Sequence, residues 1–406
     1  MTFIDRRQEQ RPKTGAAPFR LDEVFYSRTD KRGIIQSGNY VFRRVSDYDW
    51  PDLIGAPHKI VRHPDMPRGV FHYFWTRIGQ GDPFGAYVKN LARDGLHYWV
   101  FAVVLPLGDG YLSARIKPSS PLWRKMETVY ADLSAAEKSD KLAPDDSAQH
   151  LLGQLADLGF ASYDQFAAIA LAEELTCRDL ALTGAADPHL QAMKATFEAA
   201  RNMAAETQAL IHDFEGMQTI PHNLRVIASR LEPTGGPIST LSQNYGTMSR
   251  EMSGWFEHNV LGPKSDFSKI TGTVATSLFL TGMVRVLAEC EAQMRHEQRK
   301  LGHQDASEEH AQLIAATKAY QTLAHEGLMQ VRRETRRILD ACKVMNRYVL
   351  GLSSTRIMCK IESARLQEGG IGLADIIQQL KLFQERVTAR LEAVEAKAHI
   401  IALTRD

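Results

Sequence analysis

The sequence has few cysteines and almost no net charge, and both features narrow the range of functions. Its four cysteines, at positions 177, 290, 342 and 359, are far apart and form no CxxC or CxxH spacing. They are typical of free, buried thiols in a reducing compartment. The 49 Lys and Arg residues nearly balance the 48 Asp and Glu residues, so no overall field attracts nucleic acid or an anionic membrane. We therefore expect a local surface to recognise any partner.

The sequence also lacks long apolar runs. The first residues, MTFIDRRQEQRPKTG, contain no apolar core of the kind that a signal peptide needs. The longest apolar runs, at residues 100–107 and 274–287, are too short or too interrupted to cross a bilayer. These observations predict a cytoplasmic protein without a membrane span.

Familiar catalytic motifs are missing as well. The chain has no nucleophile elbow, HExxH motif, paired Cys–His arrangement or Gly-rich phosphate loop, and no cluster of metal ligands. His222 lies in a segment that looks a little like a histidine-kinase phosphoacceptor box, but no ATP-binding motif follows it. We therefore expect a protein that is not an enzyme. A haem bound through a single axial histidine would leave no motif, and the residues that could ligate it are His58, His63, His72 and His97.

The region from residue 19 to residue 117 has the pattern of an antiparallel sheet. Turn-forming residues recur about every eight to twelve positions between aromatic and β-branched segments. The expected strands are a hairpin and then a meander with Gly-containing turns, at residues 23–30, 34–42, 84–92, 96–107 and 111–118. About forty residues with mixed helical and turn signals separate the two groups. The fold class predicted for this region is α+β.

After Pro118 the sequence is rich in Ala, Leu, Glu, Gln and Arg and predicts long helices. Two sets of mostly apolar residues recur there at steps of three and four, which is the pattern of a helix-packing seam. The first set is Leu328, Val331, Thr335, Ile338, Cys342, Met345, Val349 and Leu352, and the second is Ile376, Leu380, Phe383, Val387, Leu391, Val394, Ala398 and Ile401. Such seams fit either a bundle within one chain or a dimer.

Several N-terminal segments follow one another in the order and at nearly the spacing of one known family. They are SRTD, GIIQSGNYVFRRVSDY, LIGAPHKIVRHPDMP, FHYFW, VKN, DGLHYWV and GYLSARIKP. With them, about a quarter of the chain resembles the PAS domain of the aerotaxis receptor family, the flavin-binding energy sensors of bacterial chemotaxis. The resemblance implies a five-stranded antiparallel sheet with flanking helices that binds FAD without covalent attachment. Two departures are Phe84, where the family has Trp, and VKNLARDG in place of VKNRRKNG.

The resemblance also implies a cofactor site. The family positions implicated in holding FAD or transmitting its state correspond here to Asn39, Arg62, His63, Asp65, Trp75 and Asn90. Pro64 and Pro67 restrict the backbone around three of these residues, which is the pre-organisation that such a site requires. Other roles remain open, because Asp65 could cap the next helix, Asn90 could form a cross-strand bond, and Trp75 could belong to the core.

We therefore expect a signal-transduction protein whose sensor domain, at residues 19–120, reports redox state or oxygen through bound FAD. A helical linker region at 121–232 and a helical bundle or coiled-coil output region at 238–406 would carry the signal. We favour a homodimer, since sensor modules followed by long helices commonly associate through them. The chemotaxis kinase and its coupling protein are partners that the resemblance suggests. The alternative is a PAS interaction scaffold that binds haem or no cofactor.

Overall fold

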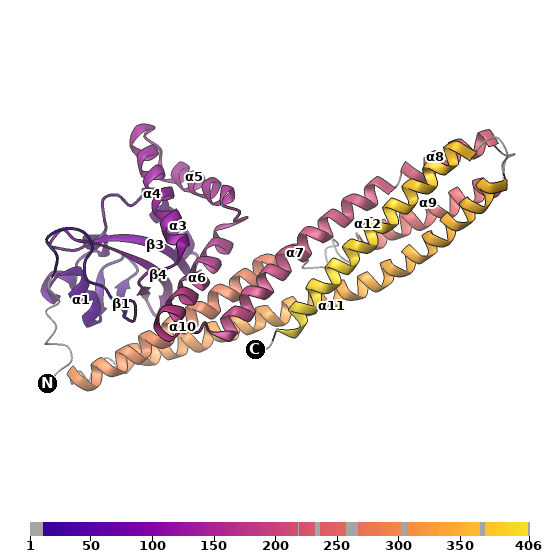
Figure 1. Ribbon diagram of the computed structural model, residues 1–406. Coiled ribbons are helices and arrows are strands. Elements are labelled where there is room, and N and C mark those ends of the chain that lie inside the picture. Colours follow the sequence, from indigo (N-terminus) through magenta and orange to yellow (C-terminus); the bar gives the residue numbers. More distant parts are fainter. Residues whose placement is uncertain are drawn as a thin grey trace. The chain divides into compact units, whose positions relative to one another are not determined.

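The computed structural model describes residues 11–217, 219–231, 236–256, 267–301, 307–365 and 370–404. The chain divides into two compact units (Figure 1). Unit 1 comprises Met1–Lys194 and Ala275–Glu326, and unit 2 comprises Ala195–Val274 and Gly327–Asp406. Both units thus combine segments that are far apart in the sequence.

Unit 1 contains an α+β domain built on one antiparallel sheet. The elements of this domain are β1 (Val24–Asp30), β2 (Ile35–Gly38), α1 (Tyr40–Ser46), α2 (Trp50–Leu53), the 3-10 helix η1 (His58–Val61), α3 (Arg68–Gly79), β3 (Phe84–Leu91), β4 (His97–Leu107) and β5 (Gly110–Ile116). The strands lie in the order β2-β1-β5-β4-β3, with antiparallel neighbours throughout. The predicted fold class and the predicted five-stranded sheet are confirmed.

The second predicted strand was too long. It ends at Gly38, and residues 40–46 form helix α1 instead. Asn39 is the reason, because its side chain accepts a hydrogen bond from the backbone N–H of Phe42 and caps the helix. An N-cap of this kind satisfies a donor that the first helical turn leaves free.

Different parts of the chain pack on the two faces of the sheet. Side chains alternate between faces along each strand, so Tyr87 of β3 faces away from its neighbours Ala86 and Val88. Tyr87 packs against Phe101 and against Phe166 of helix α6 (Tyr163–Thr183), with ring centroids 5.0 and 6.2 Å away. The opposite face carries part of the hydrophobic core, which includes Phe25, Phe42, Tyr98 and Val100. The remainder of that face borders a pocket.

Further helices complete unit 1: α4 (Pro121–Ser139), α5 (Pro144–Asp157), α6, and parts of α7 (Pro188–Met217), α10 (Ile270–Leu301) and α11 (Ser307–Arg365). Helix α10 packs closely on α6, since a Cβ atom added at Gly282 would lie 3.0 Å from the side chain of Leu171. Arg178 also pairs with Glu289 at 2.6 Å between these two helices. The helical prediction for this part of the chain is confirmed.

One segment among the described residues, Ile270–His296, is long and apolar enough to cross a membrane by length and composition alone. The sequence had suggested that no such segment exists, because the apolar stretch at residues 274–287 was considered without the helical turns that extend it. The most apolar window is 61 % buried against protein. That burial, together with the Arg178–Glu289 pair, is typical of a core helix, so the segment is weak support for a membrane span.

Unit 2 is entirely helical in its described residues, with parts of α7, α10 and α11 and the elements α8 (Thr219–Leu231), α9 (Pro237–Phe256), η3 (Phe267–Lys269) and α12 (Gly370–Leu403). Every residue of both predicted seams is buried within the chain. Polar contacts join the same helices: Asn346 of α11 donates to Glu395 of α12 at 3.2 Å, and Arg390 of α12 donates to Asp213 of α7 at 2.6 Å. The predicted seams are therefore confirmed as packing surfaces within one chain. Association of two chains stays a prediction.

Candidate functional site: a pocket on the sheet of unit 1

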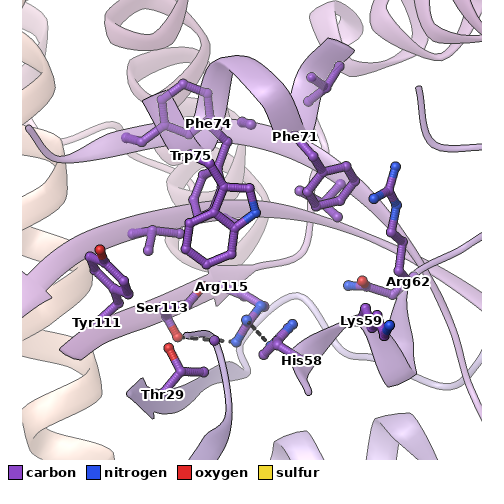
Figure 2. Close-up of a pocket in the computed structure, with 18 residues that line it drawn as sticks. Thr29, His58, Lys59, Arg62, Phe71, Phe74, Trp75, Tyr111, Ser113 and Arg115 are labelled. Atoms are coloured by element: carbon purple, nitrogen blue, oxygen red, sulfur yellow. Dashed lines mark hydrogen bonds between the residues drawn. The ribbon is translucent and has the colours of Figure 1, made fainter. Parts of the chain in front are cut away.

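A pocket of about 160 Å³ lies between the sheet and the segment that contains η1 and α3 (Figure 2). A single water molecule needs only about 10–15 Å³ measured in this way, so the pocket has room for an organic ligand. The sheet contributes Thr29, Phe84, Ala86, Val88, Asn90, Ala102, Val104, Tyr111, Ser113 and Arg115, and the remaining lining residues are Gly33, His58, Lys59, Arg62, Val70, Phe71, Phe74 and Trp75.

The roof of the pocket is aromatic. Phe71, Phe74 and Trp75 follow one another on α3 at steps of three and one, which places all three on one side of the helix. Figure 2 shows their rings above the polar side chains of the sheet. The Trp75 ring lies edge-on to Tyr111, with centroids 5.9 Å apart, and closely approaches Gly33. Trp75 therefore borders the pocket and is 43 % exposed. Its role as a cofactor contact stays a prediction.

The floor of the pocket holds a buried guanidinium. Arg115 is 4 % exposed, and it donates to Ser27 Oγ at 3.0 Å, to the Ser113 carbonyl at 3.2 Å and to His58 Nε2 at 2.7 Å. Burial lowers the pKa of Arg115 to about 10. Burial, and then the positive charge of Arg115, lower the pKa of His58 to about 3. His58 is therefore neutral and accepts a hydrogen bond from a cation.

The charge of the pocket is positive. Its described lining residues include Lys59, Arg62 and Arg115 but no Asp or Glu. Lys59 is exposed and Arg62 is half-buried. The guanidinium of Arg62 stacks on the Phe71 ring at 3.8 Å and donates to the Met66 carbonyl at 3.4 Å. The pocket is therefore suited to an aromatic ligand that carries negative charge.

Asn90 places a side-chain amide at the wall of the pocket. The residue is 3 % exposed and lines the pocket. Its backbone forms an isolated bridge with Arg62, so these two predicted site residues come together at one side of the pocket. A ligand with donors and acceptors along one edge would fit this amide, which can both donate and accept.

Two other predicted site residues, His63 and Asp65, lie beside the pocket but do not line it. Asp65 is largely exposed and pairs with Lys89 at 3.0 Å, an interaction that lowers the pKa of its carboxyl. His63 accepts a hydrogen bond from the Asp65 N–H through Nδ1 at 3.1 Å, and burial lowers its pKa. Both contacts fix the shape of the loop that leads to α3. Their role in cofactor binding stays a prediction.

Asn39 makes three hydrogen bonds to backbone groups. Besides the cap on α1, its Oδ1 accepts from the N–H of Tyr26 at 3.2 Å, and its Nδ2 donates to the Val24 carbonyl at 3.1 Å. Asn39 is 1 % exposed and is not among the residues that line the pocket. Its contacts join β1 to α1, so any effect on a cofactor would act through the fold.

The alternative role of Asp65 as a helix cap is filled by another residue. The first N–H groups of α3, those of Arg68 and Gly69, both donate at 2.9 Å to the carboxylate of Glu137 in α4. Glu137 also accepts from the Ser147 hydroxyl of α5 at 2.6 Å. The helix that roofs the pocket is thus held at its N-terminus by the α4–α5 hairpin.

We compared the chain with known proteins. It is 35% identical over 130 residues to the aerotaxis receptor of Escherichia coli (strain K12), a match that covers 31% of this chain and 26% of the receptor. The N-terminal domain thus resembles the PAS domain of the aerotaxis receptor family. The chain spans about a quarter of the length of the curated relative that it matches. No family model matches the sequence.

Two solved structures match parts of the chain. One is the PAS domain of a protein from Colwellia psychrerythraea, with 21% identity, a TM-score of 0.21, and coverage of 23% of this chain and 85% of that one. The other is a blue-light activated histidine kinase from Erythrobacter litoralis, with 13% identity, a TM-score of 0.24, and coverage of 39% of this chain and 52% of that one.

The floor of the PAS pocket was missed in the sequence analysis. Arg115 and Ser113 alternate in β5 with buried apolar residues, so both point to the same face of the sheet as Ala102 and Val104 of β4. The signal that could have revealed them is a charged residue in the centre of an otherwise apolar strand, where charge is costly. Of the four histidines considered for haem, only His58 lines the pocket, and Arg115 already donates to its Nε2.

Proposed function

We propose that the PAS domain binds FAD without covalent attachment in this pocket, and that the protein senses redox state or oxygen through it. The observation that carries the proposal is the Asn90 amide in the wall of a pocket that has an aromatic roof and no carboxylate among its described lining residues. The similarity to the aerotaxis receptor also supports it, because the resemblance of the N-terminal segments to that family implies a bound flavin.

The residues present fit this cofactor in three ways. Phe71, Phe74 and Trp75 offer flat apolar surfaces for an aromatic ring. Asn90 can donate to and accept from a ring edge that carries both carbonyl and N–H groups. Arg62 provides a planar guanidinium for phosphate oxygens. Bound FAD would supply a ring whose charge and protonation depend on its redox state.

The same strands offer a route from the pocket to the helices. Asn90 and Tyr87 belong to β3 but face opposite sides of the sheet. On the far side, the Tyr87 hydroxyl donates to Glu174 of α6 at 2.7 Å, and the same carboxylate accepts from the Ser120 N–H, at the start of α4, at 2.9 Å. A net hydrogen bond contributes about 0.5–1.5 kcal/mol. A bond gained or lost at Asn90 could therefore bias a two-state element on this route by up to about tenfold.

We further propose that the flavin acts as a signal, so that the protein is not an enzyme. It would work as a cytoplasmic homodimer, and its helices would pass the signal to a chemotaxis kinase and its coupling protein. The similarity to an aerotaxis receptor supports a role in chemotaxis signalling, and the long helices α11 and α12 offer surface for partners. Co-purification of the full chain with that kinase and coupling protein would test this part of the proposal.

The decisive experiment is a visible spectrum of the purified full-length protein, before and after incubation with FAD. We expect flavin absorption that stays with the protein through gel filtration. Replacing Asn90 with Ala should weaken FAD binding about tenfold or more, because the ring edge loses a buried hydrogen-bond partner. Asn202→Ala, at an exposed position of α7, is the matched control and should bind FAD normally.

Two results would reject the proposal. A Soret band in the spectrum would show that the protein binds haem and not FAD. A protein that stays colourless with added FAD would favour the cofactor-free scaffold. Equal FAD affinity in the Asn90→Ala and Asn202→Ala variants would reject the assigned pocket even if the protein is yellow.

A further inference from the structure

We propose that Arg115 selects the charge of the bound flavin. In this arrangement its guanidinium favours the reduced, negatively charged ring over the oxidised, neutral ring, and His58 holds the guanidinium in position. The inference rests on the proposed FAD site but assigns a separate property to it, since retention of FAD and preference between its two redox forms are measured independently.

The contacts of Arg115 leave its charge without a counter-charge. Its acceptors are a hydroxyl of Ser27, a backbone carbonyl of Ser113 and the neutral ring of His58. Among the described residues, no carboxylate lies within ion-pair distance of the guanidinium. Buried charges in proteins are normally paired, because removing an ion from water is costly. Because Arg115 lies in the pocket wall, a bound ligand would be placed to supply the negative charge that its guanidinium lacks.

His58 keeps the guanidinium oriented toward the pocket. Its ring is stacked with Phe42, with centroids 6.0 Å apart, and its Nε2 faces Arg115 at 2.7 Å. The nearby charged groups of the pocket wall, Lys59 and Arg62 from the same segment, are also cations. Because burial and the positive charge of Arg115 both oppose its protonation, His58 remains an acceptor at physiological pH and does not compete with a ligand for negative charge.

Depth distinguishes Arg115 from the other cations of the pocket. Lys59 is exposed and Arg62 is half-buried, so water and salt screen their charges. Arg115 is 4 % exposed and lies on β5 in the middle of the sheet. Figure 2 shows it below the rings of Phe74 and Trp75, at the end of the dashed lines that mark its bonds. A charge acquired by a ring in this pocket would interact most strongly with Arg115, because the surroundings there have a low dielectric constant.

The test is the midpoint potential of bound FAD in the full-length protein, measured by spectroelectrochemical titration, with the affinity for oxidised FAD measured separately. In Arg115→Met we expect the affinity for reduced relative to oxidised FAD to fall at least tenfold, which lowers a two-electron potential by about 30 mV. Arg115→Lys should retain most of the wild-type value, because it keeps the charge. Arg124→Met, at an exposed position of α4, should match the wild type.

The possible outcomes separate the two proposals. If the wild-type protein binds no FAD, the proposed function fails and the charge selection fails with it. If Arg115→Met binds FAD with an unchanged potential, only the charge selection is overturned. Circular dichroism will show whether this variant folds, and Arg115→Gln, which keeps a polar side chain, replaces it if it does not. If both variants fold but bind neither redox form, Arg115 holds the ligand without discriminating, which also overturns the inference.

Discussion

Two buried asparagines of the PAS domain differ in what their amides contact. The Asn39 amide makes three hydrogen bonds to backbone groups, and the residue does not line the pocket. Asn90 instead lines the pocket, where its amide can pair with a ligand or with water. Residue type and burial alone therefore could not distinguish an asparagine that joins two elements from one that faces a pocket.

His58 gives a prediction about pH at this scale. Its pKa is about 3 in the folded protein and 6.5 when unperturbed, so between these values the unfolded chain binds a proton that the folded chain does not. Stability should therefore fall as the pH decreases from 6.5 toward 3. The variant His58→Gln keeps an acceptor for Arg115 but does not titrate. In this variant the slope of the unfolding free energy against pH should decrease by up to the contribution of one bound proton.

Urea denaturation at several pH values in this range measures that slope. His189→Gln, on the N-terminal turn of α7, provides a control that should retain the wild-type slope. An identical slope in His58→Gln and the wild type would show that His58 is not held neutral by the fold.

At the scale of elements, α3 is placed by the α4–α5 hairpin. The backbone of α3 approaches α5 so closely that a Cβ atom added at Gly69 would lie 2.6 Å from the carbonyl carbon of Ser147. Glu137 of α4 caps the same turn of α3. Helix α3 carries the aromatic roof of the pocket and is in contact with α4 and α5. A change in the position of α3 would therefore also displace α4 and α5. This contact is a second connection between the pocket and the helices, in addition to the Tyr87–Glu174 bond.

Gly69→Ala tests this contact. Overpacking against the Ser147 backbone should destabilise unit 1 by about 1–3 kcal/mol and weaken FAD binding, because α3 must move. Gly79→Ala, at the other end of α3, has no atom within 4 Å of the added Cβ, and alanine should be neutral or stabilise the helix by about 0.5–1 kcal/mol. Urea denaturation of the two variants provides the comparison. Equal stability would mean that α3 is not docked on α5.

At the scale of the whole molecule, the two helical seams are already buried without a second chain. Leu391 of α12 is fully buried in unit 2, whereas Leu350 of α11 is 68 % exposed. Truncating a buried leucine to alanine typically costs about 2–5 kcal/mol, while an exposed position usually changes stability by less than about 0.5 kcal/mol. We therefore expect Leu391→Ala to destabilise unit 2 strongly and Leu350→Ala to have little effect on stability.

Denaturation at two protein concentrations, combined with analytical ultracentrifugation, distinguishes the two arrangements of the helices. If the seams pack within the chain, Leu391→Ala lowers stability equally at both concentrations and leaves the oligomeric state unchanged. Dissociation of a dimer by Leu391→Ala would place the seam between chains, and the packing described for unit 2 would then be wrong.

The strands of the PAS domain could be predicted because each strand is marked in its own sequence segment, by the alternation of side chains and by the turn residues at its ends. The strands at residues 84–92 and 96–107 were placed to within a residue at each end. The second strand was overextended, because a cap such as Asn39 depends on one side-chain bond and not on a periodic pattern. Of the predicted site residues, Arg62, Trp75 and Asn90 line the pocket, whereas the contribution of Arg115 required the register of β5 against β4 and β1.

The sequence by itself determined the α+β N-terminal domain, its likeness to the aerotaxis receptor, and the helical seams, because each depends on residue order or on spacing along one chain segment. The tertiary structure alone decided that Glu137 caps α3, that the segment at Ala275–Glu326 joins the PAS domain in one unit, and that a guanidinium without a carboxylate lies beneath an aromatic roof. These features join residues that are far apart in the chain. No local pattern encodes them, since packing and the burial of charge depend on distances in space.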